Sequence, residues 1–146
     1  MSAKAFVVGP MNRPQEWNVV GEHITVLVSG DATGGYEIFL QDGPQESGPP
    51  PHSHPWDESF YVVKGKIEFG IGEDRLVAVP GTLVHLPAGV THWFRFGEGG
   101  GQMVTVTSRI GASRMFADID REISPARPDL ERLVAIGARH GLTVAR

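Results

Sequence analysis

Short apolar runs separated by turns limit what the middle of this chain can fold into. Runs rich in β-branched and aromatic residues occupy positions 24–28, 36–40, 59–64, 66–70, 76–79, 82–86, 92–96 and 102–108. Such residues favour strands, and the frequent glycine and proline between the runs mark turns. Turns that recur about every 8–12 residues are typical of an antiparallel sandwich or barrel. We therefore predict an all-β fold.

The two ends of the chain differ from this middle part. Residues 1–20 contain Pro10 and Pro14 and are expected to form an extended arm, which covers a sheet edge or reaches a partner subunit. Residues 21–110 are expected to form the barrel. Residues 111–146 are expected to form a helical extension packed on the barrel.

Two helices are expected in the C-terminal extension. The first covers residues 112–119, and the second covers 128–141 with apolar residues at helical spacing. Pro128 suits the first turn of the second helix, and Gly141 suits the position after its end.

Composition excludes several classes of function. A chain of 146 residues can bury one sizeable core but is short for two domains. Its net charge of −4 argues against a surface for nucleic acid or anionic membrane. The absence of cysteine excludes disulfides, thiolate zinc sites and cysteine nucleophiles. The sequence has no apolar run near the ~20 residues of a membrane span and no secretory signal, so we expect a cytoplasmic protein.

Residues 51–65 carry the most distinctive chemistry. They place His52, His54 and Glu58 at even spacing, so that all three would face one side of an extended strand. In a straight strand His52 would lie about 20 Å from Glu58, too far for one metal ion. Pro55 is poorly tolerated inside a strand, and a bend there would turn the three side chains toward a common point. We therefore hypothesise a metal site that needs a fourth ligand from elsewhere.

Four other histidines compete to complete that site. His23 precedes a strand and His140 ends a helix, so surface positions are favoured for both. His92 differs, because it follows the turn at residues 87–89 and begins a run of alternating residues, in which it shares one face with apolar side chains. His85 lies either inside the barrel near the site or outside it, and a packed or surface position is favoured over a role beside the ligands.

The order and spacing of these residues resemble the two motifs of the cupin superfamily. The first motif, His-x-His followed by Glu and Gly, matches His52, His54, Glu58 and Gly65. The second motif, Gly-x5-Pro-x-Gly-x2-His, matches Gly81, Pro87, Gly89 and His92. The motifs span roughly residues 48–96, about a third of the chain, and two motifs in the correct order are a specific signal. Two framework positions depart from the pattern: Glu46 stands where a glycine is usual, and Phe96 where an asparagine is usual.

This resemblance implies a double-stranded β-helix, the cupin jelly-roll barrel, with short C-terminal helices. It also implies a divalent metal ion held by His52, His54, Glu58 and His92, with Glu58 able to accept a proton during turnover. Imidazoles and one carboxylate suit Fe, Mn, Co, Ni, Cu or Zn. The competing interpretations are that the metal has only a structural role and stabilises the barrel, or that the histidines bind no ion.

Aromatic residues near the ligands are candidates for an apolar substrate pocket. The candidates, with one histidine, are Trp56, Phe60, His85, Phe94 and Phe96. Aromatic residues at strand spacing are more often core residues, so the competing interpretation is that they pack the barrel.

The resemblance is compatible with three functions on a small-molecule substrate. The first is a dioxygenase-type oxidoreductase acting on a small aromatic or enolic molecule, because four protein ligands on an octahedral ion leave two positions for substrate and for O₂ or water. The flanking helices also resemble short cupins often compared with quercetin dioxygenase, a likeness that says little about substrate. The second is a non-redox isomerase, lyase or decarboxylase, and the third is a small-molecule-binding module without turnover. Cupin barrels often dimerise through an edge strand or an N-terminal arm, so a homodimer is expected.

Overall fold

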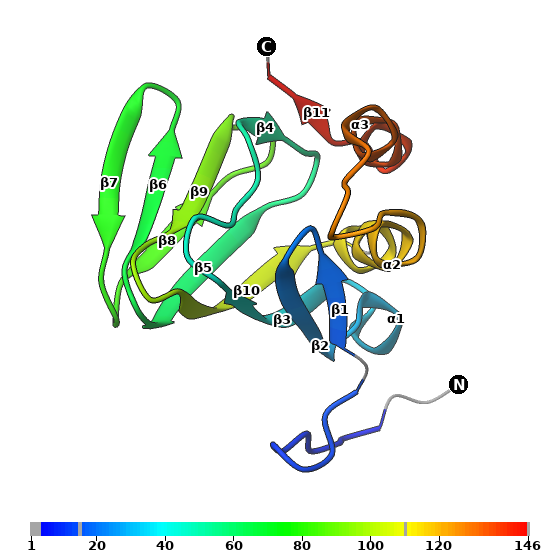
Figure 1. The fold of residues 1–146 in the computed structure, drawn as a ribbon. Coiled ribbons are helices and arrows are strands. Elements are labelled where there is room, and N and C mark those ends of the chain that lie inside the picture. Colours follow the sequence, from blue (N-terminus) through cyan, green and yellow to red (C-terminus); the bar gives the residue numbers. More distant parts are fainter. Residues whose placement is uncertain (1–3, 15, 110, 146) are drawn as a thin grey trace.

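Two antiparallel β-sheets form the body of the molecule (Figure 1). The computed structural model describes residues 4–14, 16–109 and 111–145. The six-stranded sheet has the order β1 (Glu16–Val19), β2 (Glu22–Val28), β3 (Tyr36–Gly43), β10 (Gly101–Ser108), β5 (Glu58–Lys64), β8 (Leu83–Leu86). The five-stranded sheet has the order β11 (Thr143–Val144), β4 (His52–Ser53), β9 (His92–Phe96), β6 (Ile67–Ile71), β7 (Asp74–Ala78).

The strand order identifies the fold. β10 lies between β3 and β5, and β9 lies between β4 and β6, so strands distant in sequence are neighbours in each sheet. Every pairing between the described strands is antiparallel. Crossovers of this kind in a double-sheet all-β protein are those of a jelly roll. The predicted all-β jelly-roll fold is confirmed.

Alternation along the strands builds the core between the sheets. On β5, Glu58, Phe60 and Val62 are buried, whereas Tyr61 and Val63 on the other face are exposed. The inward side chains of the two sheets meet in one cluster, whose largest members are Phe60, Phe69, Phe94, Phe96 and Met103. A second cluster lies under the helices and includes Phe39, Trp56, Phe116, Ile119 and Ile136.

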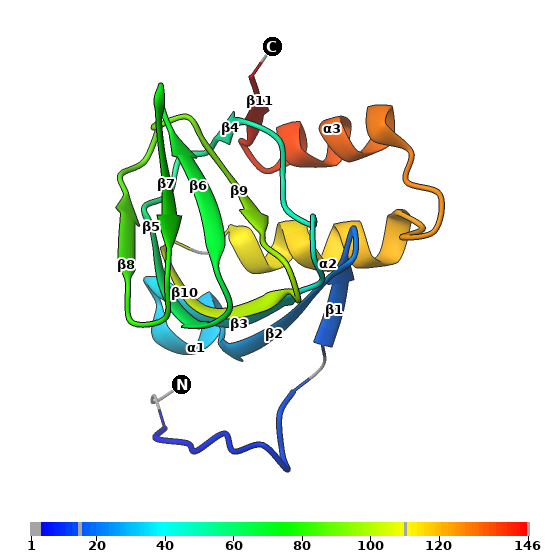
Figure 2. The same ribbon diagram turned by 60° about the vertical axis from the view of Figure 1, so that its left-hand side comes forward.

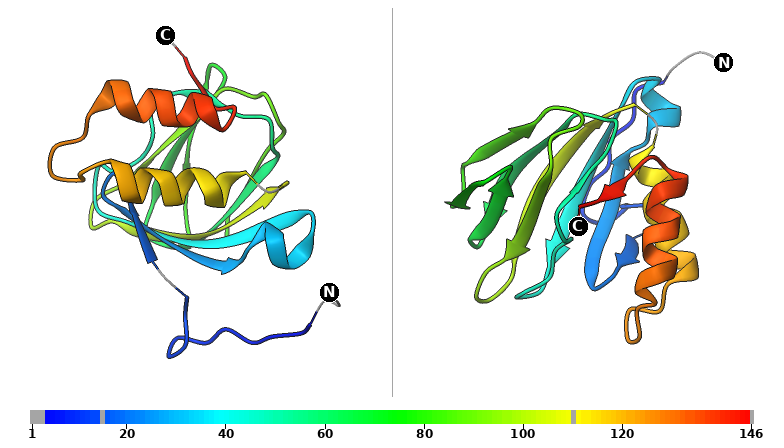
Figure 3. Two further views of the ribbon diagram at one scale, coloured as in Figure 1. Left: turned by 90° about the vertical axis from the view of Figure 1, so that its right-hand side faces the viewer. Right: turned by 90° about the horizontal axis from the view of Figure 1, so that it is seen from above.

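Two helices cover the side of the sandwich where β1 and β11 lie (Figures 1 and 2). α2 (Ala112–Glu122) packs on β1, and α3 (Leu130–Arg139) packs on α2 and β11. The left view of Figure 3 has the two helices in front of the strands, one above the other. Within the described residues, no helix is long and apolar enough to cross a membrane.

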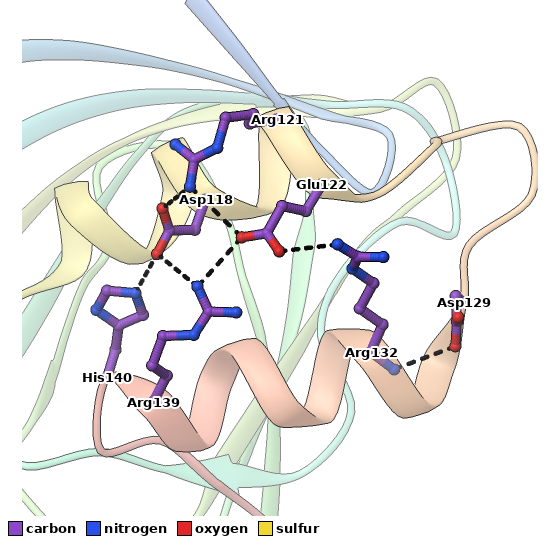
Figure 4. A network of polar contacts seen from close by, with 7 residues as sticks. All are labelled: Asp118, Arg121, Glu122, Asp129, Arg132, Arg139 and His140. Carbon is purple, nitrogen blue, oxygen red and sulfur yellow. Dashed lines mark hydrogen bonds and ion pairs between the residues drawn. The ribbon is translucent and has the colours of Figure 1, made fainter.

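Ion pairs hold α3 against α2 (Figure 4). Glu122 on α2 accepts from Arg132 at 3.1 Å and from Arg139 at 3.2 Å, both on α3. Asp118 on α2 lies 2.6 Å from the Nε2 of His140, the residue that ends α3. These contacts tie the two helices together along their length.

Several elements differ from the expected boundaries. The C-terminal end of the expected arm forms β1, which pairs with β2 at the sheet edge. The expected turn after β2 contains one helical turn, α1 (Gly30–Thr33), because Ser29 caps it at the N-terminal end. The second helix begins at Leu130 rather than at 128, because Asp129 accepts a hydrogen bond from the backbone N–H of Arg132 and so caps it.

The glycine that ends the first motif has a steric role. Gly65 follows β5 with φ +75°, a conformation that disfavours other residues. A Cβ at this position would lie 2.2 Å from the carbonyl oxygen of Gly100, so the turn from β5 to β6 requires glycine.

Candidate metal centre

Two short strands and the bend after them bring three histidines together. β4 and β9 pair with His52 opposite His92, and His54 lies just beyond the end of β4. The ligand nitrogens of the three histidines lie within 4.8 Å of one another, and all three residues are buried. The chain bends at Pro55 before Glu58 begins β5, as the sequence predicts.

Backbone carbonyls determine which nitrogen each histidine presents. The Nδ1 atoms donate to carbonyl oxygens two residues away: His52 to Pro50 at 2.8 Å, His54 to Trp56 at 3.0 Å and His92 to Val90 at 2.9 Å. A carbonyl can only accept, so each Nδ1 carries the proton. In a neutral ring the lone pair is then on Nε2, which is the atom that faces the cluster.

Glu58 adds a carboxylate to this cluster. Its Oε1 lies 3.1 Å from His54 Nε2 and 3.3 Å from His92 Nε2. Burial acts to raise the pKa of Glu58, whereas His54 and His92, through hydrogen bonds and charge when their rings are protonated, outweigh burial and hold the pKa at about 2. Burial, together with the neighbouring His92, lowers the pKa of His52 to about 4. At neutral pH the cluster therefore contains an ionised carboxylate, Glu58, and a buried ring, His52, that resists protonation.

These donors fit a divalent metal ion. Three imidazole lone pairs and a carboxylate are all acceptors, and acceptors that face one another need a shared cation. His92 Nε2 is buried, and it has no hydrogen-bond partner among the described residues. His52, His54 and His92 with Glu58 would hold the ion, and the residues present fit it.

The other histidines lie elsewhere. His23 pairs with a carboxylate on β1 at the surface, and His140 bonds Asp118 between the helices. His85 is exposed on the outer face of β8, where its Nδ1 lies 2.8 Å from Ser59 Oγ. The choice of His92 over these three agrees with the geometry.

His52, His54 and Glu58 line a cavity of about 460 Å³. The polar part of its wall comprises His52, His54, Glu58, Glu22 and Gln41. The apolar part includes Trp56, Phe94, Phe116, Ile119 and Leu133. α2 and α3 thus supply much of the apolar wall, and an occupant would meet both oxygen and nitrogen atoms and a larger hydrocarbon surface.

The residues expected to line a substrate pocket separate into two groups. Trp56 and Phe94 line the cavity, and Trp56 stacks on His54 with ring centroids 4.4 Å apart. Phe60 and Phe96 are fully buried in the core between the sheets and do not line it. His85 does not line it either, because its position on β8 points away from the core.

Two polar residues of the wall are absent from the sequence-based candidates. Glu22 begins β2 and Gln41 lies on β3, and both are buried. A signal for Glu22 was available, because it is in phase with the buried Ile24 on the same strand. A carboxylate on the inward face of a strand is uncommon without a role.

A second hollow of about 530 Å³ lies beside the loops around Gly43, Gly65 and Gly100. It is more open than the cavity at the metal centre and contains none of the clustered histidines. The chemistry is therefore assigned to the smaller cavity.

Comparison with known sequences gives two matches. A family model described as "Cupin domain" matches residues 39–107. The chain is similar to quercetin 2,3-dioxygenase from Bacillus subtilis (strain 168), with 28% identity over 97 residues, which cover 65% of this chain and 29% of that protein. The chain therefore spans less than a third of the length of this relative.

Comparison with solved structures gives matches at low sequence identity. KdgF from Halomonas sp. matches with a TM-score of 0.64 and 18% identity, over 72% of this chain and 93% of that one. An RmlC-like cupin from Shewanella frigidimarina matches with a TM-score of 0.63 and 15% identity, over 74% and 94%. The polyketide cyclase RemF from Streptomyces resistomycificus matches with a TM-score of 0.62 and 17% identity, over 72% and 80%. At these identities the likeness shows the fold alone.

Proposed function

Because the chain belongs to the cupin superfamily, we propose that it is a metal-dependent oxidoreductase of the dioxygenase type, acting on a small aromatic or enolic molecule. The observation that carries this proposal is the convergence of three buried histidines and one carboxylate at a largely apolar cavity. The relative whose name includes 2,3-dioxygenase and quercetin supports an oxygen-bearing aromatic substrate.

The ligands in this proposal are His52, His54, Glu58 and His92. A divalent ion bound there would supply Lewis-acid and redox chemistry to a substrate oxygen and to O₂. The backbone carbonyls that hold each Nδ1 keep the three Nε2 atoms oriented, so little side-chain freedom is lost on binding an ion.

The cavity walls would position the substrate and exclude water. Trp56 and Phe94 offer aromatic surface beside the ligands, and Phe116 and Leu133 from the helices offer apolar surface on the other side. A flat, mostly apolar molecule with an oxygen at one edge matches this division of polar and apolar wall.

The first test is metal content together with O₂ consumption. We expect the purified protein to carry close to one equivalent of a divalent metal, and we expect O₂ uptake when quercetin is added. His92→Ala should lower metal content at least about tenfold, because it removes one of the three imidazole ligands. His85→Ala is the matched control, since His85 lies outside the cavity, and it should leave metal content unchanged.

The same test separates the rival functions. Product formation without O₂ uptake would favour a non-redox isomerase, lyase or decarboxylase. Binding without any product by mass spectrometry would favour a binding module. A wild-type protein that takes up no divalent metal would contradict all metal-dependent versions of the proposal.

A further inference from the structure

Glu22 is a buried carboxyl group in the cavity wall that the proposed metal ligation does not use. It begins β2, is only 6% exposed and lines the same cavity as His52 and His54. β2 belongs to the six-stranded sheet, as does β5, whereas β4 and β9, the strands of His52 and His92, belong to the five-stranded sheet.

A chain of hydrogen bonds holds Glu22 in place. The hydroxyl of Thr105 on β10 donates to Gln41 Oε1, so the amide group of Gln41 is oriented with its nitrogen toward Glu22. Gln41 Nε2 then donates to Glu22 Oε1 at 3.1 Å. This row crosses three neighbouring strands of the six-stranded sheet. It satisfies one oxygen of Glu22, and no hydrogen bond from the described residues reaches the other oxygen.

Among the described residues, no side-chain cation pairs with Glu22. The residues that line the cavity include no lysine or arginine, and within the described chain no ion pair involves Glu22. Gln41 faces it from β3 and is neutral, whereas Glu58 on β5 adds a negative charge nearby. A buried, unpaired carboxylate is costly, so the neutral acid is the favoured form.

The remaining charged groups on the adjacent elements face other partners. On β1, Glu16 pairs with His23 at the surface. On α2, Asp120 accepts from the backbone N–H of Asn18, and Asp118 bonds α3. The imidazoles on the ligand side of the cavity carry their protons on Nδ1, toward the backbone.

The pKa of Glu22 agrees with this environment. Burial raises it, the hydrogen bond from Gln41 offsets part of the rise, and the charge of Glu58 adds to it, with the result at about 8. Glu58 in the same cavity has a pKa of about 2. Two carboxyl groups whose environments separate their pKa values in this way are a frequent basis for acid and base roles in one site.

We propose that Glu22 is a second functional carboxyl group, which acts as a neutral acid and donates its proton to an oxygen of the substrate held in the cavity. The O–H bond of Glu22 breaks and its electron pair stays on the carboxylate, where Gln41 stabilises it. A lone pair of the substrate oxygen forms the new O–H bond, and water returns the proton to Glu22 between turnovers.

The proposal also defines the substrate class. The occupant presents a carbonyl, enolate or phenolate oxygen toward Glu22 and an apolar body toward Phe94 and the helices. This inference rests on the proposed function for its substrate, but the protonation state of Glu22 can be measured without turnover.

The first measurement is carboxyl ¹³C NMR on protein labelled at glutamate. The Glu22 resonance is assigned by its loss in Glu22→Gln. We expect it to report a protonated carboxyl at about pH 6.5 and to titrate near the value of about 8. Titration in the ordinary range for glutamate, about 4.3, would overturn the proposal.

The second measurement is calorimetric binding of phenylglyoxylate, which remains an anion throughout and combines oxygen acceptors with an aromatic ring. We expect wild-type affinity to fall at least about tenfold between about pH 6.5 and about pH 9.5, because the ionised Glu22 repels the anion. Glu22→Gln keeps a donor but cannot ionise, so its affinity should change little over this range.

The matched control is Glu16→Gln, which alters an exposed glutamate on the adjacent strand and should behave as wild type. The same pH dependence in Glu22→Gln as in wild type would overturn the proposal, and failure of wild type to bind the probe at about pH 6.5 would overturn the substrate class. Failure of the proposed function can be distinguished from failure of this inference. If only the proposed function is wrong, the purified protein contains no metal but Glu22 still titrates near 8.

Discussion

At the scale of single residues, the site depends on side-chain-to-backbone hydrogen bonds that the two cupin sequence motifs do not specify. His52, His54 and His92 each donate Nδ1–H to a backbone carbonyl close in sequence. These bonds fix the tautomer before any ion binds, so the histidines present lone pairs rather than protons to the centre. His52 also makes the site sensitive to acid, because burial of its ring disfavours the charged form and lowers its pKa.

We predict that burial of His52 costs the metal-free protein stability as the pH falls from about 6.5 to about 4. Glu22 contributes in the opposite direction, because its raised pKa of about 8 adds stability as the pH falls from about 8 to about 4.5. His52 has a native pKa of about 4, below its unfolded value of 6.5. Between these values the unfolded chain binds a proton that the native state does not, so the contribution of His52 to the free energy of unfolding falls with falling pH. The loss is on the order of 3 kcal/mol and is absent above about pH 6.5.

Urea unfolding of chelator-treated protein across this range measures the effect. Without the contribution of His52, the stability of His52→Gln should rise as the pH falls from about 6.5 to about 4.5, because the contribution of Glu22 remains. His85→Gln should follow wild type, because His85 is exposed. Equal slopes in wild type and His52→Gln would show that burial of His52 is not the cause. Below about pH 4.5 a further loss is expected as Glu58, whose native pKa is about 2, becomes protonated in the unfolded chain first.

The members of the histidine–carboxylate cluster could be named from sequence, and their surroundings only partly so. Even spacing put His52, His54 and Glu58 on one side, and Pro55 indicated the bend. Phe60 has the same parity as Glu58, but it lies further along β5 in the core, and parity cannot tell a cavity wall from a core. Glu22 entered the site only through the pairing of β2 with β3, which no local pattern specifies.

At the scale of elements, a helix pair forms part of the cavity wall and is attached by exposed charges. Arg132 and Arg139 are 56% and 51% exposed, whereas Asp118 and Glu122 are mostly covered. Exposed ion pairs contribute little to global stability. Their effect here is local, because they determine how firmly α3 stays against α2.

We predict that Asp118→Asn loosens α3 without unfolding the barrel. The substitution removes the charge that pairs with His140, Arg121 and Arg139. Hydrogen–deuterium exchange of the α3 amides should become several-fold faster, and added salt should produce a similar change in wild type because it screens these charges. Exchange in β5 and β10 should be unaffected.

Asp31→Asn serves as the control for this experiment. Asp31 also pairs with an arginine on α2, Arg114, but this pair does not involve α3. Faster α3 exchange in both variants, or in neither, would contradict the assigned role of Asp118.

Element positions were predictable where periodicity was long enough. The strands from β5 to β10 lie between glycine and proline turns, and all were anticipated. β5, β8, β9 and β10 alternate between buried and exposed or half-buried residues, whereas four consecutive residues of β7 are exposed. β4 and β11 have two residues each, too few for any period, and exist only because of pairing with distant strands. Glu46 has φ 71°, so the backbone keeps the left-handed conformation at the position where the first motif usually has glycine.

At the scale of the whole molecule, we propose that two copies associate through the β8 edge of the six-stranded sheet. β8 ends the sheet, and Leu83 on it is 63% exposed opposite Tyr61 on β5, which is 48% exposed. An edge strand with exposed apolar residues is a common site of strand or sheet association.

Light scattering coupled to size-exclusion chromatography tests this proposal. Wild type should elute with the mass of a homodimer, and Leu83→Lys should elute as a folded monomer, because a charge cannot be buried at the interface without a partner. Val77→Lys, at the exposed edge strand β7, should remain dimeric. A monomeric wild type would refute the assembly, and a dimeric Leu83→Lys would refute the interface.

β4, the strand that carries His52, receives its two neighbours from distant parts of the chain. β9 pairs with it on one side, and on the other β11 places Val144 opposite His52 and Thr143 opposite Ser53. Pairing strands that are far apart in sequence closes a long loop of chain, which is slow. These two pairings are therefore expected to form after the local hairpins. We therefore expect the histidine cluster to mature late in folding, when β11 has docked. Metal binding by this chain would then follow the formation of the barrel rather than initiate folding.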